Sequence, residues 1–187
     1  MTTPLPPSVR PLAALALALA CAPSACDSGA SATPSPFPDV GDSYPAATVR
    51  ACDGASVSLS DWIAAHDVVY IGFGAKWCQA CQEEAPVLNA ELVDGLAGKS
   101  VGVAQILVED DPGLAPPQSL CAAWHDDLSA RYDVFVDVDQ ESLEPHFGGA
   151  IANLPLHYIV TKDGTIRLRK LGALPDDIKQ LVSDWLP

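Results

Sequence analysis

Two cysteines separated by two residues form the most chemically informative motif of this sequence. Cys78 and Cys81 enclose Gln79-Ala80, directly after Trp77, where an apolar run ends and a helical pattern begins. The first turn of a helix carries unpaired N–H groups and partial positive charge, which stabilise a thiolate and lower the pKa of the first cysteine. The second thiol then lies one helical turn further on, close enough to form a disulfide with the first.

This arrangement predicts thiol–disulfide exchange, with Cys78 as the nucleophile and Cys81 as the residue that resolves the mixed disulfide. A purely structural disulfide and half of a zinc site are the alternatives. A zinc site needs further ligands, and the sequence contains no second Cys-x-x-Cys and no His-x-x-x-His. We therefore expect redox chemistry at these two cysteines, with no bound metal and no cofactor.

The elements around the motif alternate between strand and helix patterns. Residues 68–73 are an almost continuous apolar run, which is typical of a strand buried on both faces. A helix is expected over residues 78–96, with an apolar stripe at Ala85, Leu88, Leu92 and Leu96. Further strands are expected at 57–59, 101–108, 134–138, 156–160 and 165–171, and further helices at 120–128 and 178–185. This order predicts an α/β fold with a mixed central sheet flanked by helices on both faces.

The stretch from Phe73 to Cys81 resembles the active-site strand and loop of the thioredoxin-like superfamily. Glu84 and Pro86 match the Cys-x-x-Glu-x-Pro continuation of its TlpA- and ResA-like members, which are exported, membrane-anchored thiol–disulfide oxidoreductases. Pro86 falls where the active-site helix of that family is kinked. Residues 151–155 resemble the segment that carries the family's cis-proline, and Asp163-Gly164 matches the turn after it. The resemblance covers about residues 40–187 and implies a thioredoxin-like fold.

The same resemblance assigns roles to residues around the cysteines. It implies that Trp77 belongs to the active site and that Pro155 is cis and lies against the disulfide. A proline there has no N–H to donate and leaves room for the extended backbone of a partner. Asn153 departs from the family, which usually has glycine two residues before this proline.

A second departure concerns the proton of the resolving thiol. Thioredoxin has a buried acid six residues before the first cysteine, and Gly72 stands at that position here. We expect Glu84 to be a solvated helix carboxylate rather than a substitute for that acid. We also expect His157, on the strand after Pro155, to be a core residue with satisfied hydrogen bonds rather than a metal ligand.

Two more cysteines, Cys52 and Cys121, lie within the folded part of the chain. Cysteines of exported proteins usually pair, because the compartment is oxidising. We therefore predict a structural Cys52–Cys121 disulfide that ties the N-terminal segment to the domain. Two separate buried thiols are the alternative.

The N-terminus has the pattern of a targeting signal. Arg10 precedes an apolar run over residues 12–20, which ends at Cys21 and is too short to span a bilayer. Small residues before the cysteine resemble a bacterial lipobox, so we predict a lipoprotein-type signal peptide over residues 1–20 and lipidation of Cys21. Lipidation at Cys26 and a cleaved signal peptide without lipid are the alternatives.

The composition changes again after the signal. Residues 21–45 are rich in Ser, Ala and Pro, so we expect a flexible tether followed by a thioredoxin-like domain over residues 46–187. Such a spacer lets a lipid-anchored domain stand away from the membrane. The formal net charge of −14 disfavours nucleic acid and anionic membrane surfaces as partners.

Together these features predict an exported, membrane-anchored thiol–disulfide oxidoreductase that faces the periplasm or the cell exterior. Its expected partners are the thiols and disulfides of exported proteins and an upstream electron donor. We expect it to act as a reductant, although Gln79-Ala80 does not fix the direction of electron flow.

Two other functions remain open. A copper-handling module would use Cys78, Cys81 and His157. A thiol peroxidase would share the fold, but the Pro-x-x-x-Thr-x-x-Cys motif of peroxiredoxins is missing.

Overall fold

The computed structural model describes residue 2, residues 36–149 and residues 152–187. The predicted signal peptide, apart from Thr2, and both candidate lipidation sites, Cys21 and Cys26, lie outside the described residues. No helix in the described part of the chain is long and apolar enough to cross a membrane.

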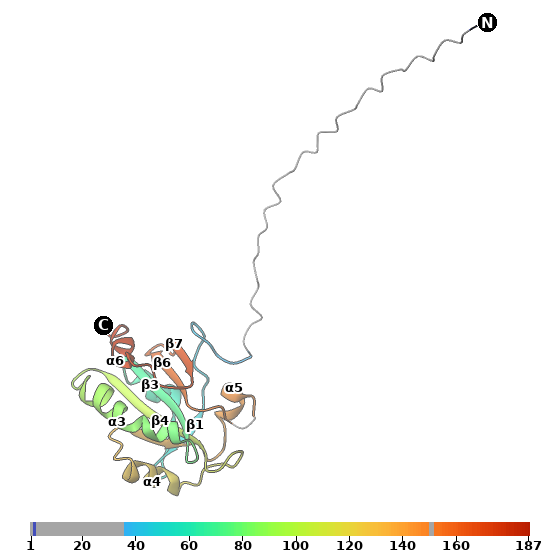
Figure 1. Cartoon of the computed structure of the whole chain (residues 1–187). Coiled ribbons are helices and arrows are strands. Elements are labelled where there is room, and N and C mark those ends of the chain that lie inside the picture. Colours follow the sequence, from blue (N-terminus) through green and yellow to red (C-terminus); the bar gives the residue numbers. More distant parts are fainter. Residues whose placement is uncertain (1, 3–35, 150–151) are drawn as a thin grey trace. The chain divides into compact units, whose positions relative to one another are not determined.

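A mixed sheet of seven strands forms the centre of the described domain (Figure 1). The strands lie in the order β2-β1-β5-β4-β3-β6-β7. Their bounds are β1 (Thr48–Ala51), β2 (Ser56–Ser58), β3 (Val68–Ala75), β4 (Val101–Glu109), β5 (Asp133–Val136), β6 (Leu156–Thr161) and β7 (Ile166–Leu171). The central strand β3 is parallel to β4 and antiparallel to β6, and the pair β6–β7 is antiparallel as predicted.

Helices cover both faces of this sheet. Their bounds are α1 (Leu59–Ala64), α2 (Gln79–Glu83), α3 (Ala85–Val87), η1 (Leu88–Asp94), α4 (Ser119–Asp127), α5 (Leu143–Phe147) and α6 (Ile178–Ser183). Val68 and Tyr70 of β3 belong to one core cluster with residues of α2, η1, α4 and α6. Val69 and Ile71 belong to the other, with residues of α1 and α5. Alternate side chains of β3 thus point to opposite faces, and the predicted α/β fold with a two-sidedly buried central strand is confirmed.

The helix expected over residues 78–96 is divided into α2, α3 and η1, with its first break beside Pro86, where the family resemblance implies a kink. Pro86 lacks an N–H, and its ring conflicts with the carbonyl of the preceding turn, so the regular hydrogen bonding is interrupted there. Beyond this break η1 is a π-helix, in which the N–H of Gly95 donates to the carbonyl of Ala90 at 3.0 Å. Glu84 stands at the junction of α2 and α3.

The sequence pattern does not predict three short elements, β1, α1 and α5. The first turn of α1 is capped by Ser58, whose hydroxyl accepts a hydrogen bond from the N–H of Asp61. α5 ends at Gly148, whose φ of 71° favours glycine. Both helices bury a leucine, Leu59 or Leu143, in the second core cluster, so packing rather than length stabilises them.

The last residues assigned to the tether pair with the sheet instead. The N–H of Gly41 donates to the carbonyl of Ile166 at 2.9 Å, and the N–H of Tyr44 donates to the carbonyl of Gly164 at 2.8 Å. Ser43 forms a β-bridge with Thr165, and the Tyr44 side chain is buried. The boundary expected at residue 46 therefore falls inside the folded unit, because an aromatic side chain supplies the apolar surface that the Ser/Ala/Pro stretch lacks.

Candidate active site

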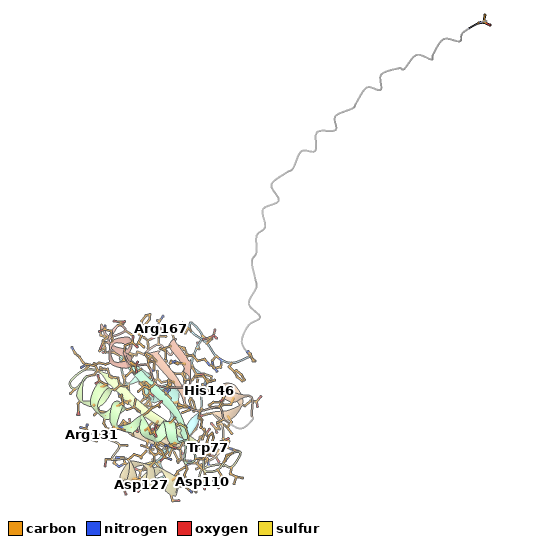
Figure 2. The ribbon with its side chains drawn as sticks, in the orientation of Figure 1. Trp77, Asp110, Asp127, Arg131, His146 and Arg167 are labelled. Atoms are coloured by element: carbon orange, nitrogen blue, oxygen red, sulfur yellow. A yellow bond between two sulfur atoms is a disulfide. The ribbon has the colours of Figure 1, made fainter. Side chains whose placement is uncertain are left out.

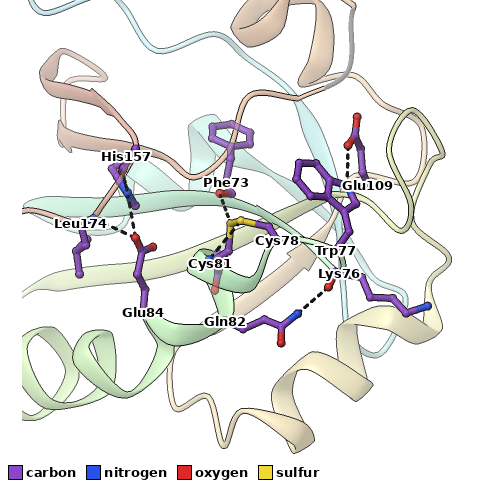
Figure 3. The surroundings of a disulfide bond; sticks show 12 residues. Phe73, Lys76, Trp77, Cys78, Cys81, Gln82, Glu84, Glu109, His157 and Leu174 are labelled. Carbon is purple, nitrogen blue, oxygen red and sulfur yellow. Dashed lines mark hydrogen bonds and ion pairs between the residues drawn. A yellow bond between two sulfur atoms is a disulfide. The ribbon is translucent and has the colours of Figure 1, made fainter.

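The cysteine motif lies between the end of β3 and the start of α2 (Figure 3). Cys78 and Cys81 form a disulfide with Cα atoms 5.3 Å apart. Cys78 is the N-cap residue of α2, and its Sγ accepts a hydrogen bond from the N–H of Cys81 at 3.2 Å. Cys78 is 5% exposed, whereas Cys81 is fully buried. The less buried cysteine therefore also receives the N–H group that stabilises a thiolate.

The loop that precedes β6 carries the proline. The Leu154–Pro155 peptide bond is cis, and Pro155 is buried. Leu156 pairs with Phe73 at the end of β3, the strand from which the cysteine loop emerges. The sheet register thus brings the proline and the cysteines to the same end of the molecule, although they are far apart in the sequence. Asn153 is exposed.

Trp77 is held by Glu109, which the sequence pattern does not predict as part of the site. Trp77, labelled in Figure 2, is 38% exposed. Its indole Nε1–H donates to the carboxylate of Glu109 at 2.9 Å (Figure 3). Glu109 is the last residue of β4, one position beyond the predicted strand 101–108. The position of Glu109 in the sequence could have indicated its role, because a carboxylate at the end of a buried strand needs hydrogen-bond donors as partners.

Glu84 is not the solvated carboxylate that the sequence predicts. It is only 8% exposed, and its Oε1 accepts a hydrogen bond from the N–H of Leu174 at 3.0 Å. The same oxygen lies 3.6 Å from Nε2 of His157 (Figure 3). Burial raises the pKa of Glu84 to about 7. The prediction fails because the break before Pro86 places Glu84 beneath the loop that follows β7.

His157 is the core residue with satisfied hydrogen bonds that the sequence predicts. Its Nε2 lies 2.8 Å from the carbonyl of Gly172, which only accepts, so Nε2 carries the proton and Nδ1 accepts from the hydroxyl of Tyr70 at 2.8 Å. Burial lowers the pKa of His157 to about 4, which keeps the ring neutral near pH 7.

Gly72 lies opposite His157 in the β3–β6 register. A Cβ at this position would lie 2.9 Å from the hydroxyl of Tyr70. The neutral Tyr70–His157 pair thus occupies the space of the acid found in thioredoxin. Glu84 is the carboxylate that contacts this pair, through His157.

The second pair of cysteines is also bonded. Cys52, at the end of β1, and Cys121, in α4, form a disulfide with Cα atoms 5.1 Å apart and a sequence separation of 69. Cys121 is fully buried and Cys52 is exposed. The bond ties the β1–β2 hairpin to α4.

The described residues bring together no group of three or more His, Cys, Asp or Glu side chains that could hold a metal ion. Both ring nitrogens of His157 are used within the protein, so this residue offers no free ligand for copper.

The AhpC/TSA family model matches residues 40–169 of the chain. A search of curated proteins found no match.

Solved structures share the fold at low sequence identity. The thioredoxin domain of a thiol-disulfide oxidoreductase from Bacteroides vulgatus has a TM-score of 0.64 and 19% identity, covering 79% of this chain and 98% of that one. A secreted disulfide oxidoreductase of Mycobacterium tuberculosis has a TM-score of 0.58 and 16% identity, covering 74% and 95%. A peroxiredoxin-like protein from Aquifex aeolicus has a TM-score of 0.62 and 18% identity, covering 81% and 90%.

Proposed function

Because the chain is a thioredoxin-like oxidoreductase of the AhpC/TSA family, we propose that it exchanges disulfides with exported proteins, as a reductant. The observation that carries this proposal is the Cys78–Cys81 disulfide at the start of α2, in which the less buried cysteine accepts the N–H of the other cysteine. Trp77 directly precedes Cys78 and is partly exposed, and the loop of the cis-proline Pro155 lies at the same end of the sheet, so the two loops would hold an extended partner segment.

The proposed reaction has two exchange steps. In the reduced protein, the Cys78 thiolate attacks a substrate disulfide, forms a mixed disulfide and releases one substrate thiolate. Cys81 then loses its proton and attacks the Sγ of Cys78, which forms the Cys78–Cys81 disulfide and releases the second substrate thiolate. Two electrons pass to the substrate, and an upstream dithiol donor reduces the protein again.

The direction of electron flow is tested by the reduction potential of this disulfide. We expect a value of about −270 mV in equilibrium with a dithiol redox buffer, since reducing thioredoxins lie in that range. Insulin reduction in the presence of dithiothreitol measures the activity itself. A potential of about −120 mV, together with net oxidation of substrate thiols, would show that the protein works in the opposite direction.

We propose that Glu84 accepts the proton that Cys81 loses. A carboxyl with a pKa of about 7 is partly ionised at neutral pH and can therefore both take up and release a proton. Glu84 lies three residues after Cys81, one helical turn further on, and its N–H donates to the carbonyl of Ala80. The neutral His157 beside it offers no competing charge.

A Glu84→Gln variant is expected to resolve the mixed disulfide more slowly by about tenfold or more, because a general base is removed. The pH dependence of that step is expected to lose its inflection near pH 7. Stopped-flow measurement of the single-turnover rate between pH 5 and 9 checks both results. Glu83→Gln is the matched control, because Glu83 neighbours Glu84 on an exposed position. Equal profiles for the two variants would contradict the role.

The raised pKa of Glu84 also predicts a change in stability. Native Glu84 keeps its proton up to about pH 7, whereas the unfolded chain loses it near 4.5, so its contribution to the free energy of unfolding falls as pH rises through this window. The loss totals about 3 kcal/mol. Urea denaturation at pH 4.5 and 7.5 is expected to show this fall in the wild type relative to Glu84→Gln, a comparison that cancels the titration of buried histidines.

Family membership and the similarity to a peroxiredoxin-like protein favour a second candidate, thiol peroxidase. Hydrogen peroxide would oxidise the Cys78 thiolate to a sulfenic acid, and Cys81 would displace water to form the disulfide. The missing peroxiredoxin motif argues against it. Peroxide consumption with dithiothreitol as the donor separates the two candidates, and we expect it to be much slower than insulin reduction.

We further propose that the protein is exported and anchored through a lipid on Cys21, with the Ser/Ala/Pro-rich stretch that follows as a spacer. The proposal is supported by Arg10, the apolar run over residues 12–20 and the small residues before the cysteine. Mass spectrometry of the mature N-terminus is expected to show a diacylated or triacylated Cys21. A mature chain that begins at Cys26, or that carries no lipid, contradicts this.

A further inference from the structure

Glu109 joins two loops of the active site through one carboxylate. The side chain is fully buried at the end of β4. Its Oε2 accepts a hydrogen bond from Nε1–H of Trp77 at 2.9 Å (Figure 3). Its Oε1 accepts a hydrogen bond from the backbone N–H of Ala152 at 2.9 Å.

These two donors belong to the two sides of the site. Trp77 directly precedes Cys78, and Ala152 lies three residues before Pro155. The Glu109 backbone adds a third link, since its carbonyl accepts from the N–H of Lys76 at 3.1 Å. One residue therefore contacts the cysteine loop twice and the proline loop once.

The chemistry of the contacts requires a carboxylate of this length. Both partners are donors, so a glutamine would meet one of them with its own NH₂ group and lose that bond. An aspartate is shorter by one methylene and cannot reach both donors from the same backbone position. No Lys, Arg or His of the described residues forms an ion pair with Glu109, so its charge is met by N–H donors alone.

We propose that Glu109 is a positioning residue that sets the separation between the Trp77-Cys78 loop and the Ala152–Pro155 loop. The gap between these loops is where an extended substrate backbone would lie beside Cys78, so the inference rests on the proposed function. Glu109 then determines how well the disulfide of a polypeptide substrate is aligned with Cys78, and it leaves the intrinsic reactivity of Cys78 unchanged.

The proposal is tested by comparing two classes of disulfide. A Glu109→Gln variant is expected to reduce a disulfide-bonded protein, insulin, with a kcat/KM lower by about tenfold or more. The reason is that a misplaced substrate backbone raises the activation free energy of the exchange step. The rate of reduction of a small aromatic disulfide, 5,5′-dithiobis(2-nitrobenzoate), is expected to stay within about twofold of the wild-type rate, because this substrate has no polypeptide backbone to bind between the two loops. Equal losses for both substrates, or no loss for either, would overturn the proposal.

Asp111→Asn is the matched control. Asp111 is exposed and lies two residues after Glu109, so the control removes a nearby carboxylate and leaves the contacts of Trp77 and Ala152 in place. Its kinetics are expected to match the wild type. Glu109→Asp is the second variant if Glu109→Gln does not fold, and it is expected to show the same selective loss.

A spectroscopic readout separates this inference from the proposed function. In ¹⁵N-labelled protein, the Trp77 indole N–H or the Ala152 amide is expected to exchange with solvent much faster in Glu109→Gln, with the core amides of β3 unchanged. A wild type that reduces no disulfide refutes the proposed function, whereas unchanged protection of both N–H groups refutes the positioning role.

Discussion

Cys78→Ser is expected to abolish disulfide exchange, and Cys81→Ser is expected to accumulate a mixed disulfide with the substrate. A hydroxyl in place of the Cys78 thiol cannot attack a disulfide, so no product forms. With Cys81 replaced, Cys78 still attacks, but nothing resolves the intermediate. The losses are among the largest expected for this protein, since each variant removes a bond-forming atom.

Non-reducing mass spectrometry of substrate mixtures checks this prediction. We expect a covalent adduct through Cys78 in the Cys81→Ser protein and none in the Cys78→Ser protein. Alkylation of the reduced wild type adds a second measurement, because Cys78 is expected to react with iodoacetamide much faster than the buried Cys81. Adducts formed through Cys81, or faster alkylation of Cys81, would reverse the two roles.

Removing the Cys52–Cys121 bond is expected to give the largest loss of stability without loss of exchange. The bond closes a loop with a sequence separation of 69. By the chain-entropy model, closing such a loop raises the free energy of unfolding by about 4 kcal/mol. The Cys52→Ser/Cys121→Ser double variant is preferable to a single one, because it leaves no unpaired thiol to form wrong disulfides.

Urea denaturation of the oxidised proteins measures this effect, and insulin reduction by the same samples shows whether the active site survives. We also expect mild reductant to open Cys78–Cys81 first, because the N–H of Cys81 at the start of α2 stabilises the Cys78 thiolate and so favours the reduced form. If the double variant were as stable as the wild type, or if peptide mapping found both cysteines free, the bond would have no structural role.

The local parts of the site follow from the sequence, because neighbouring residues determine them. The apolar run at 68–73 lies inside β3, and the Cys-x-x-Cys motif begins a helix, both as predicted. Both features can be predicted because each depends on only a few consecutive residues. The hairpin β6–β7 likewise follows from its turn and its alternation. The α/β fold class then follows from the order of these elements.

The contacts of the two carboxylates do not follow, because their partners are distant in the sequence. Glu109 is separated by 32 residues from Trp77 and by 43 from Ala152. Glu84 is separated by 90 residues from Leu174, whose N–H it accepts. A carboxylate on a helix is usually solvated. Glu84 is buried because the loop after β7 covers it, and the local sequence does not show this contact. The family resemblance implies the kink at Pro86, whereas the apolar spacing alone continues through residues 78–96 without a break.

Because the active-site helix is divided, only residues near its start can affect the acidity of the Cys78 thiol electrostatically. A continuous helix over residues 78–96 would align its peptide dipoles over its whole length, whereas α2 ends at Glu83. The field at Cys78 therefore comes from the first turn, above all from the N–H of Cys81. Charge changes at the far end of η1, such as at Asp94, should leave the acidity of the Cys78 thiol unaltered. Residues 79–81 are thus the part of this helix in which evolution or design can tune that acidity.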